Sequence, residues 1–418
     1  MEQHMNKRFC YLCIDGATSV IESQVISHLE LIHESGHGIS FDLFLLSRTR
    51  DAEESSLFNP QRKRELEERM GGRLIVGTFN SVLTGFLFTL WLLFRFTFPA
   101  CFTKKLILHP RALDGGFMAA CFKWMCLGFP RVVFDERDDA PSEFIFEAKV
   151  SGRSRWSVWF LINYYKHLLM EWFAVRSATK VIYVSNALRG IMEKRYPFSS
   201  KKSGGVFPSL CDERMFFFNQ ELRKKKRKEL GLLVNQYVLA YVGGVESYQH
   251  FNETIVLYKE CRRIKADMFF IFITRKRNHE AVLEKLRTFL PEKSCMVEEM
   301  AHDQVCEVLN AADMGVLLRE PSEASIGASP VKFAEYLLCG LPIVLPKGIG
   351  DYSKLIKDEN MGVVAEDLMD IEGLARKCIK YLDGHGDEKN RKRIASLARQ
   401  RLSRQSRIPD YISFYHSI

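Results

Sequence analysis

The sequence lacks an apolar run long enough to span a bilayer. The strongest candidate, residues 81–94, has fourteen uncharged residues before Arg95 interrupts it, whereas a spanning helix needs about 20 apolar residues. The chain has 418 residues, of which 47% are hydrophobic and 27% are charged. That composition is globular and excludes disordered, collagen-like and multi-span membrane proteins.

A secretory signal is also lacking. Met1–Arg8 is polar, and the apolar run that follows, Phe9–Ile14, has only six residues, which is too short for a signal peptide. The eleven cysteines are an odd number. Cys10 and Cys13 form a C-x-x-C pair inside that run, so we expect core thiols rather than a redox or zinc site. We therefore expect the protein on the cytosolic side of a membrane.

A large charge excess of one sign is absent as well. Lys and Arg number 60 and Asp and Glu number 51, which gives a net charge of +9. This modest excess favours anionic partners such as phosphorylated ligands or acidic headgroups. Nucleic acid is not expected, because no binding motif is present and the basic residues are not interleaved with stacking aromatics.

Short apolar runs alternate with amphipathic segments in the first half of the chain. Six runs have the length of buried strands: Phe9–Ile14, Ser40–Leu46, Arg73–Val76, Leu106–His109, Arg131–Asp135 and Thr179–Val184. Strands that alternate with helices imply a parallel sheet with helices on both faces.

The same pattern then starts again. Six further runs predict a second sheet: Tyr237–Val242, Met268–Thr274, Ser294–Glu298, Met314–Leu318, Ile343–Leu345 and Gly362–Val364. Between the two sets, Ser199–Gly205 has the composition of a hinge. The predicted fold class is α/β, with two doubly wound, Rossmann-like domains at residues 1–205 and 206–392. Ligands in such folds lie at the carboxyl ends of the strands, so a cleft between the domains is the expected site.

Two stretches allow more than one interpretation. Residues 81–98 form a buried crossover helix, a monotopic membrane-docking helix or, despite Arg95, a membrane span. The basic run Arg223–Lys228 is either a solvated helix face or a contact for acidic headgroups.

The densest signal in the second domain is a strand, loop, helix and strand between residues 314 and 345. Ser329 is expected to cap a helix that begins at Pro330, and Gly340 is expected to end it. Lys332 and Glu335 lie one turn apart on the helix side opposite its apolar residues. They suit a nucleoside diphosphate, with phosphates at the helix start and the ribose one turn on. The alternative is an exposed ion pair between the two.

A resemblance to a known family adds to this interpretation of the helix. The segment from Ser329 to Val344, SPVKFAEYLLCGLPIV, resembles the nucleotide-binding signature of glycosyltransferase family 4, the group 1 transferases, which have the GT-B fold. Looser similarities occur elsewhere: residues 109–111, 134–137, 184–185, 207–208, 241–244, 312–319 and 348–351.

The resemblance implies a hexosyltransferase that moves a sugar from a nucleotide sugar to an acceptor hydroxyl. It implies retention at the anomeric carbon and neither a metal nor a cofactor beyond the donor. Glu335 would bind the ribose, and Lys332 would hold the diphosphate together with the backbone of Ser329, Pro330 and Val331. Gly243 and Gly244 would let the backbone approach the phosphates, and Arg275 would add charge.

The sequence departs from this family at two places. The glutamate expected eight positions before Glu335 is replaced by Gly327, and Glu320 and Glu323 stand nearby at the wrong spacing. Ser247-Tyr248-Gln249 occupies the position where the family has an Arg and Lys pair. We interpret the second departure as a branch in which Lys332 supplies the cation.

In the first domain, the resemblance assigns His109 and Arg111 to the end of the fourth strand, as catalytic residues beside Lys332. Asp135, Arg137 and Asp138 follow the fifth strand and form an expected acceptor rim rather than a metal site. Residues 393–418 would form a last helix that crosses back to the first domain. Its aromatic residues, Tyr411, Phe414 and Tyr415, would anchor it there.

The leading hypothesis is a bacterial transferase of surface-polysaccharide or glycolipid assembly. It would be peripheral on an anionic membrane and act on a saccharide or lipid-linked acceptor. Two alternatives stay open: a nucleotide-sugar epimerase or hydrolase of the same fold, and a non-catalytic GT-B-like subunit.

Overall fold

The computed structural model describes residues 7–14, 21–49, 59–245, 247–288, 294–320 and 322–418. Most of the polar stretch Met1–Arg8 lies outside the described residues. The chain forms two compact units, Met1–Pro208 with Arg407–Ile418, and Ser209–Ser406. The first division falls near the predicted boundary after residue 205, and the second falls further along the chain than residue 392.

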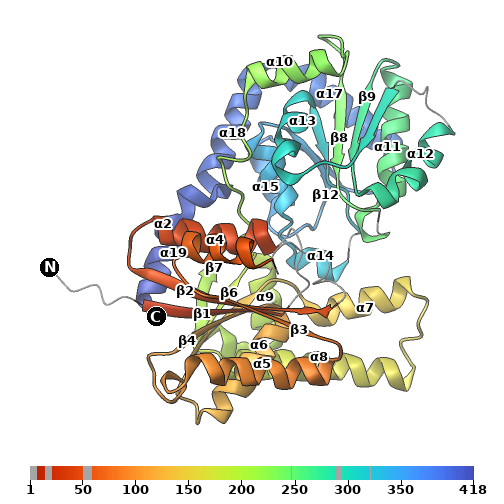
Figure 1. Ribbon diagram of the computed structural model, residues 1–418. Coiled ribbons are helices and arrows are strands. Elements are labelled where there is room, and N and C mark those ends of the chain that lie inside the picture. The colour runs from red at the N-terminus through yellow and green to blue at the C-terminus, as the bar shows by residue number, and fades with distance from the viewer. Residues whose placement is uncertain (1–6, 15–20, 50–58, 246, 289–293, 321) are drawn as a thin grey trace. The chain divides into compact units, whose positions relative to one another are not determined.

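The first unit is built on a parallel seven-stranded sheet in the order β3-β2-β1-β4-β5-β6-β7 (Figure 1). Its strands are β1 Lys7–Ile14, β2 Ile39–Arg48, β3 Leu74–Phe79, β4 Ile107–Arg111, β5 Arg131–Glu136, β6 Lys180–Tyr183 and β7 Ser203–Val206. The six predicted strands are confirmed. Cys10 and Cys13 are buried in the core as residues of β1, as expected.

The predicted hinge at Ser199–Gly205 is wrong, because its second half is the edge strand β7. The glycines there serve packing. A Cβ at Gly204 would lie 2.6 Å from a ring carbon of Phe414 and 3.0 Å from Ile182. Only a residue without a side chain lets the C-terminal helix approach this strand so closely.

Helices cover both faces of this sheet. They are α2 Ser27–Glu34, α4 Pro60–Met70, α5 Val82–Thr97, α6 Ala112–Met125, α7 Ala140–Val150, α8 Val158–Ser177 and α9 Asn186–Arg195. Helices α5, α6 and α8 form a layer on one face, and α2 and α4 lie on the other (Figure 1).

Helix α5 is the uncharged stretch that allowed three interpretations. Ser81 caps it through a reciprocal pair of hydrogen bonds with Thr84. Leu90, Leu92 and Leu93 are buried, so this side packs as a crossover helix does, while Trp91 on the other side is exposed. Among the described residues, no helix combines the length and the apolar character that a bilayer crossing requires.

The expected last helix is two helices, α18 Glu388–Leu402 and α19 Arg404–Ser417, and residues from Arg407 onward belong to the first unit. The aromatic anchor is confirmed. The ring of Tyr415 lies 5.0 Å from Phe9, and that of Tyr411 lies 4.4 Å from Phe207.

The second unit is built on a parallel six-stranded sheet in the order β10-β9-β8-β11-β12-β13. Its strands are β8 Val238–Val242, β9 Phe269–Ile273, β10 Cys295–Glu298, β11 Met314–Val316, β12 Ile343–Pro346 and β13 Gly362–Ala365, which confirms all six predicted runs. Its helices are α10 Gln220–Glu229, α11 Phe251–Ile264, α12 His279–Arg287, α13 Val305–Ala311, α14 Glu323–Gly327, α15 Val331–Leu338, α16 Tyr352–Asp358, α17 Ile371–His385 and α18. One apolar core lies on each face of the sheet, with α15 in one and α11 and α17 in the other.

Candidate functional site

Helix α15 is fixed against the ends of two strands. The Tyr336 hydroxyl accepts a hydrogen bond of 2.8 Å from the backbone N–H of Val242, the last residue of β8. The Tyr336 ring packs on Gly315 in β11, where a Cβ would come within 2.4 Å of it. The start of the helix is therefore held beside the carboxyl ends of β8 and β11, where ligands bind in folds of this class.

The predicted cap by Ser329 is wrong. The helix begins at Val331 after Pro330, and Ser329 makes no capping hydrogen bond. Its hydroxyl accepts a hydrogen bond of 2.8 Å from Ser209 N–H and lies 2.7 Å from the Tyr352 hydroxyl. Pro330 occupies the N-cap position, one residue later than expected, so Ser329 stands one residue too early to cap the helix.

The start of α15 meets the loop after β8. Lys332 Nζ donates a hydrogen bond of 2.8 Å to Gln249 Oε1, and the Tyr241 hydroxyl lies 3.0 Å from the same oxygen. A Cβ at position 243 would lie 2.2 Å from Lys332 Nζ and 2.7 Å from Gln249 Oε1, so a side chain there would displace both partners of this hydrogen bond. The sequence placed Gly243, Gly244 and Lys332 in one site, and the structure brings Gly243 and Lys332 together.

These groups line a cavity of about 170 Å³. Its lining comes from the loop after β8, the end of β11 and the start of α15: Tyr241, Tyr248, Gln249, Leu317, Leu318, Arg319, Pro330, Val331 and Lys332. The volume is below the roughly 300–1,000 Å³ of pockets that hold a whole drug-sized ligand. The cavity therefore suits an anionic fragment such as a phosphate group, met by Lys332 and the N–H groups of the helix start.

Glu335 lies one turn deeper and is buried at 4% exposure. On the same helix side Tyr336 and Cys339 are buried too, whereas Lys332 is half-buried. Glu335 Oε1 lies 2.8 Å from His302 Nε2, so the alternative of an exposed pair between Lys332 and Glu335 is wrong. The sequence pointed to neither His302 nor Gln249 as partners, because each comes from a loop distant along the chain.

The hydrogen bond to Glu335 raises the pKa of His302 above its usual value, although burial acts in the opposite direction. The His302 ring also packs 5.1 Å from that of Phe216. Glu335 therefore faces a histidine that carries a positive charge over a wider pH range than a free one.

Other residues predicted for this site lie apart from the cavity. Arg275 is exposed after β9 and does not line it. Gly327 ends the short helix α14, whose first residue, Glu323, is exposed. Glu320 Oε2 lies 3.0 Å from His250 Nε2.

Of the residues predicted in the first unit, His109 and Asp135 are buried, whereas Arg111, Arg137 and Asp138 are half-buried. His109 lies in the middle of β4, since the strand continues to Arg111, and is 2% exposed. The expectation that it ends the strand is therefore wrong. Its ring packs 4.6 Å from that of Tyr11, and neither ring nitrogen has a hydrogen-bond partner among the described residues. Burial lowers the pKa of His109 to about 4, so the ring is neutral at physiological pH.

The expected acceptor rim is an internal ion cluster at Asp135. This residue is inside β5 and 3% exposed. It accepts hydrogen bonds from the Tyr11 hydroxyl at 3.2 Å and from Arg137 at 3.3 Å, and Arg111 lies 3.7 Å away. Burial alone would raise the pKa of Asp135, but the two arginines hold it below its usual range. Asp138 is half-buried beyond the strand.

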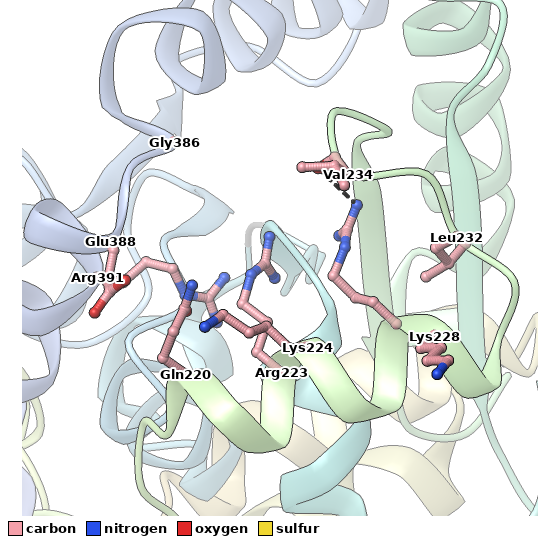
Figure 2. Close-up of a pocket in the computed structure, with 10 residues that line it drawn as sticks. Gln220, Arg223, Lys224, Lys228, Leu232, Val234, Gly386, Glu388 and Arg391 are labelled. Carbon is pink, nitrogen blue, oxygen red and sulfur yellow. Dashed lines mark hydrogen bonds between the residues drawn. The ribbon is translucent and has the colours of Figure 1, made fainter.

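A second, larger cavity of about 600 Å³ lies beside the basic run 223–228 (Figure 2). Figure 2 shows Arg223 and Arg391 among the side chains that line it. Arg223 donates to the carbonyl oxygens of Asn310, Ala311 and Ala312 at the end of α13. Arg227 Nη1 lies 3.2 Å from Asp313. These two arginines satisfy the C-terminal carbonyls of a helix, whereas Lys224, Lys225 and Lys228 of the same run are exposed.

Part of the chain matches a known protein family, and that part includes the first cavity. Residues 223–401 match the family described as Glycosyl transferases group 1, and this segment contains the loop after β8, Lys332 and Glu335. No curated protein has a sequence that matches the chain.

Several solved structures share the fold over nearly the whole chain. HepE from Anabaena in complex with UDP-glucose is 14% identical, with a TM-score of 0.68 over 98% of this chain and 99% of that one. Sucrose-phosphate synthase from Thermosynechococcus elongatus is 11% identical, with a TM-score of 0.66 over 98% of each chain. WaaG, a glycosyltransferase involved in lipopolysaccharide biosynthesis, is 13% identical, with a TM-score of 0.63 over 96% of this chain and 98% of that one.

The contact between Lys332 and Gln249 predicts how the small cavity responds to charge. Gln249→Glu keeps the side-chain shape and places a carboxylate at the position 2.8 Å from Lys332 Nζ. We expect it to weaken binding of inorganic pyrophosphate about tenfold or more, because the ammonium is neutralised. Isothermal calorimetry measures this, and Gln400→Glu on the exposed side of α18 is the charge-matched control. Equal affinity in the two variants would contradict the assignment of the cavity.

The pair of His302 and Glu335 predicts a pH-dependent contribution to stability. Because the pKa of His302 is raised in the folded state, the pair stabilises the fold fully below the pKa of unfolded histidine, about 6.5, and this stabilisation declines as the pH rises through the folded value. The melting temperature of the wild type should therefore exceed that of His302→Gln more at about pH 5.5 than at about pH 8.5. A constant difference across this range, measured by differential scanning calorimetry, would show that the pair does not titrate.

Proposed function

We propose that this chain, a group 1 glycosyltransferase with the GT-B fold, moves a sugar from a nucleoside-diphosphate donor to a hydroxyl group of a membrane-linked saccharide or lipid. The anomeric carbon keeps its configuration. The observation that carries the proposal is the meeting of Lys332, the start of α15 and the loop after β8 at one cavity.

The diphosphate would occupy that cavity. Lys332 Nζ exchanges its hydrogen bond with Gln249 Oε1 for a phosphate oxygen, and the first N–H groups of α15 add the positive end of the helix dipole. The loop at Gly243 and Gly244 has no side chain that would keep the phosphates from the backbone. Arg319, whose guanidinium lies 5.3 Å from the Tyr248 ring, is a further cation at the rim.

The ribose would bind to Glu335. One carboxylate oxygen already accepts from His302, but an ionised carboxylate has about four acceptor positions, so ribose hydroxyls can be added without loss of that contact. His302 holds the carboxylate in place, and burial excludes water that would compete for it.

The reaction then requires little covalent chemistry from the protein. The bond between the anomeric carbon and the β-phosphate oxygen breaks, and the acceptor oxygen bonds to that carbon on the same face. The acceptor proton passes to the departing diphosphate. Negative charge grows on the diphosphate during this step, so Lys332 stabilises the transition state more than the ground state.

Roles for the first unit are part of the proposal. His109 and Arg111 are the candidates for turnover, and Asp135, Arg137 and Asp138 are the candidates on the acceptor side. The neutral imidazole of His109 is suited to accept or donate a hydrogen bond without adding charge. The acceptor and a peripheral location on the cytosolic face of an anionic membrane belong to the same proposal.

A donor screen tests the reaction class. Uridine, guanosine, adenosine and cytidine diphosphate sugars are scored by thermal shift and by release of nucleoside diphosphate with and without lipid extract. HepE is described in complex with UDP-glucose, which makes the uridine series the first choice. Release that depends on the extract supports a transferase. Release without it supports a hydrolase, and binding without any turnover supports a non-catalytic subunit.

Two substitutions separate the phosphate and ribose contacts. Lys332→Ala should weaken binding of UDP at least tenfold and leave uridine binding nearly unchanged, because only the diphosphate carries the charge that Lys332 meets. Glu335→Gln should weaken both about tenfold or more, since hydrogen bonds to a charged group are worth roughly 1.5–3 kcal/mol. Calorimetric titration measures the affinities for UDP and uridine in both variants. Lys354→Ala and Glu284→Gln, which change exposed residues of the same types, are the controls. A uniform loss for UDP and uridine in Lys332→Ala would remove Lys332 from the phosphate site.

A further inference from the structure

The tryptophans of this chain are not core residues. The sequence has five, and all five are exposed in the first unit, by 41% to 89% of their surface. Trp91 lies on α5, Trp124 at the end of α6, Trp156 just before α8, and Trp159 and Trp172 on α8. We call the exposed side of these three helices the tryptophan face. Large aromatic side chains rarely gather on a protein surface without a partner.

These helices form one layer on one side of the first sheet (Figure 1). Phe117 on α6 lies 6.4 Å from Phe86 on α5 and 6.0 Å from Phe173 on α8, measured between ring centroids. Further exposed apolar residues extend the layer's outer side: Leu83, Leu87, Phe98, Ile162, Tyr165 and Leu169. The sides of these helices that face the sheet already pack into the core. The apolar residues on the outer side are therefore not needed for folding.

The exposed charges of α5, α8 and the residues that flank them have one sign, whereas α6 carries the exposed Asp114. Residues 69–113 contain no Asp or Glu, and residues 148–180 contain only Glu171, which is buried and paired with Arg195 at 2.7 Å. Exposed basic residues accompany the aromatic ones: Arg95, Lys104, Lys105, Arg153, Lys166 and Arg176. Arg153 lies 4.8 Å from the ring centroid of Trp159, so a basic and an aromatic side chain of this face are in contact.

We propose that the tryptophan face docks on the headgroup region of an anionic bilayer. This inference rests on the proposed function in one respect: the membrane-linked acceptor of that proposal gives the protein a reason to bind a membrane. Tryptophan and tyrosine favour this region because the apolar ring lies toward the acyl chains while the polar N–H or O–H bonds to headgroups and water. The basic residues meet acidic headgroups, and the lack of exposed carboxylates in the two segments removes repulsion.

A second copy of the chain fits this face less well. A two-fold contact places the same patch against itself, so the basic residues of one copy would face those of the other with no acidic partner in these segments. The sequence linked membrane contact to α5 and to Arg223–Lys228. The structure instead favours α8 as the partner of α5, because Arg223 and Arg227 are engaged with the carbonyls and Asp313 beside α13.

The tryptophan distribution supplies its own probe. Because every tryptophan lies on this face, the intrinsic fluorescence of the full-length protein reports on it alone. With phosphatidylcholine vesicles that contain phosphatidylglycerol, we expect a blue shift of the emission and quenching by brominated lipid. Added salt should reverse both, because the attraction to headgroups is screened. An emission unchanged by anionic vesicles would overturn the proposal.

Substitutions locate the contact. Arg153→Glu with Lys166→Glu should weaken cosedimentation with anionic vesicles more than tenfold, since each basic residue near such a surface contributes about fivefold. Trp91→Glu with Trp159→Glu should do the same, whereas Met369→Glu, at a fully exposed apolar position of the second unit, should bind as the wild type does. Vesicle binding that is equal in all variants, or self-association that these changes abolish without any vesicle response, would overturn the membrane assignment.

The same preparations distinguish this inference from the proposed function. UDP binding by calorimetry should be unchanged in all these variants, which also shows that they are folded. Loss of vesicle binding with intact UDP binding leaves the donor site standing. Vesicle binding by a wild type that binds no nucleotide supports the tryptophan face and contradicts the proposed function.

Discussion

The hydrogen bond from Val242 N–H to the Tyr336 hydroxyl fixes the geometry of the candidate site. It ties the end of a central strand to the second turn of α15, and Gly315 lets the Tyr336 ring lie flat on the neighbouring strand. The helix start is thereby held beside the loop after β8, where a Cβ at position 243 would displace Lys332 Nζ from Gln249 Oε1. The Lys332 ammonium is placed by this hydrogen bond on a fixed helix, so the scaffold positions a charge for a ligand in advance.

The second unit contains two groups of cations, and their partners differ in kind. Arg223, Arg227 and Arg391 donate to backbone carbonyls around the end of α13, and Arg223 and Arg227 also face Asp313. Removing such an arginine leaves carbonyl oxygens unsatisfied in a buried place, which is a stability effect. Lys332 instead donates to a neutral amide. Exchanging a neutral partner for phosphate costs little free energy. We therefore assign the three arginines a structural role and Lys332 a binding role.

Most of the fold could be predicted, because buried parallel strands appear in sequence as short apolar runs. The errors arise where tertiary contacts decide. In the sequence Gly204 is typical of a hinge. Its actual role is to make room for Phe414, which lies far along the chain and packs against it. Ser329 has the residue type of a cap, but Ser209 and Tyr352 engage its hydroxyl. Motif spacing placed Lys332 and Gly243 in one site, whereas no local pattern reveals that Gln249 and His302 hold Lys332 and Glu335. His109 stands in a motif, yet its burial follows from Tyr11 and Tyr415.

The central claim is that the start of α15 and the loop after β8 bind the diphosphate. A crystal structure of the protein with UDP tests it most directly. The account predicts the β-phosphate within hydrogen-bond distance of Lys332 Nζ and of the first N–H groups of α15, with the ribose hydroxyls on Glu335. A diphosphate bound instead in the larger cavity, against Arg223 and Lys224, with Lys332 still on Gln249, would contradict it.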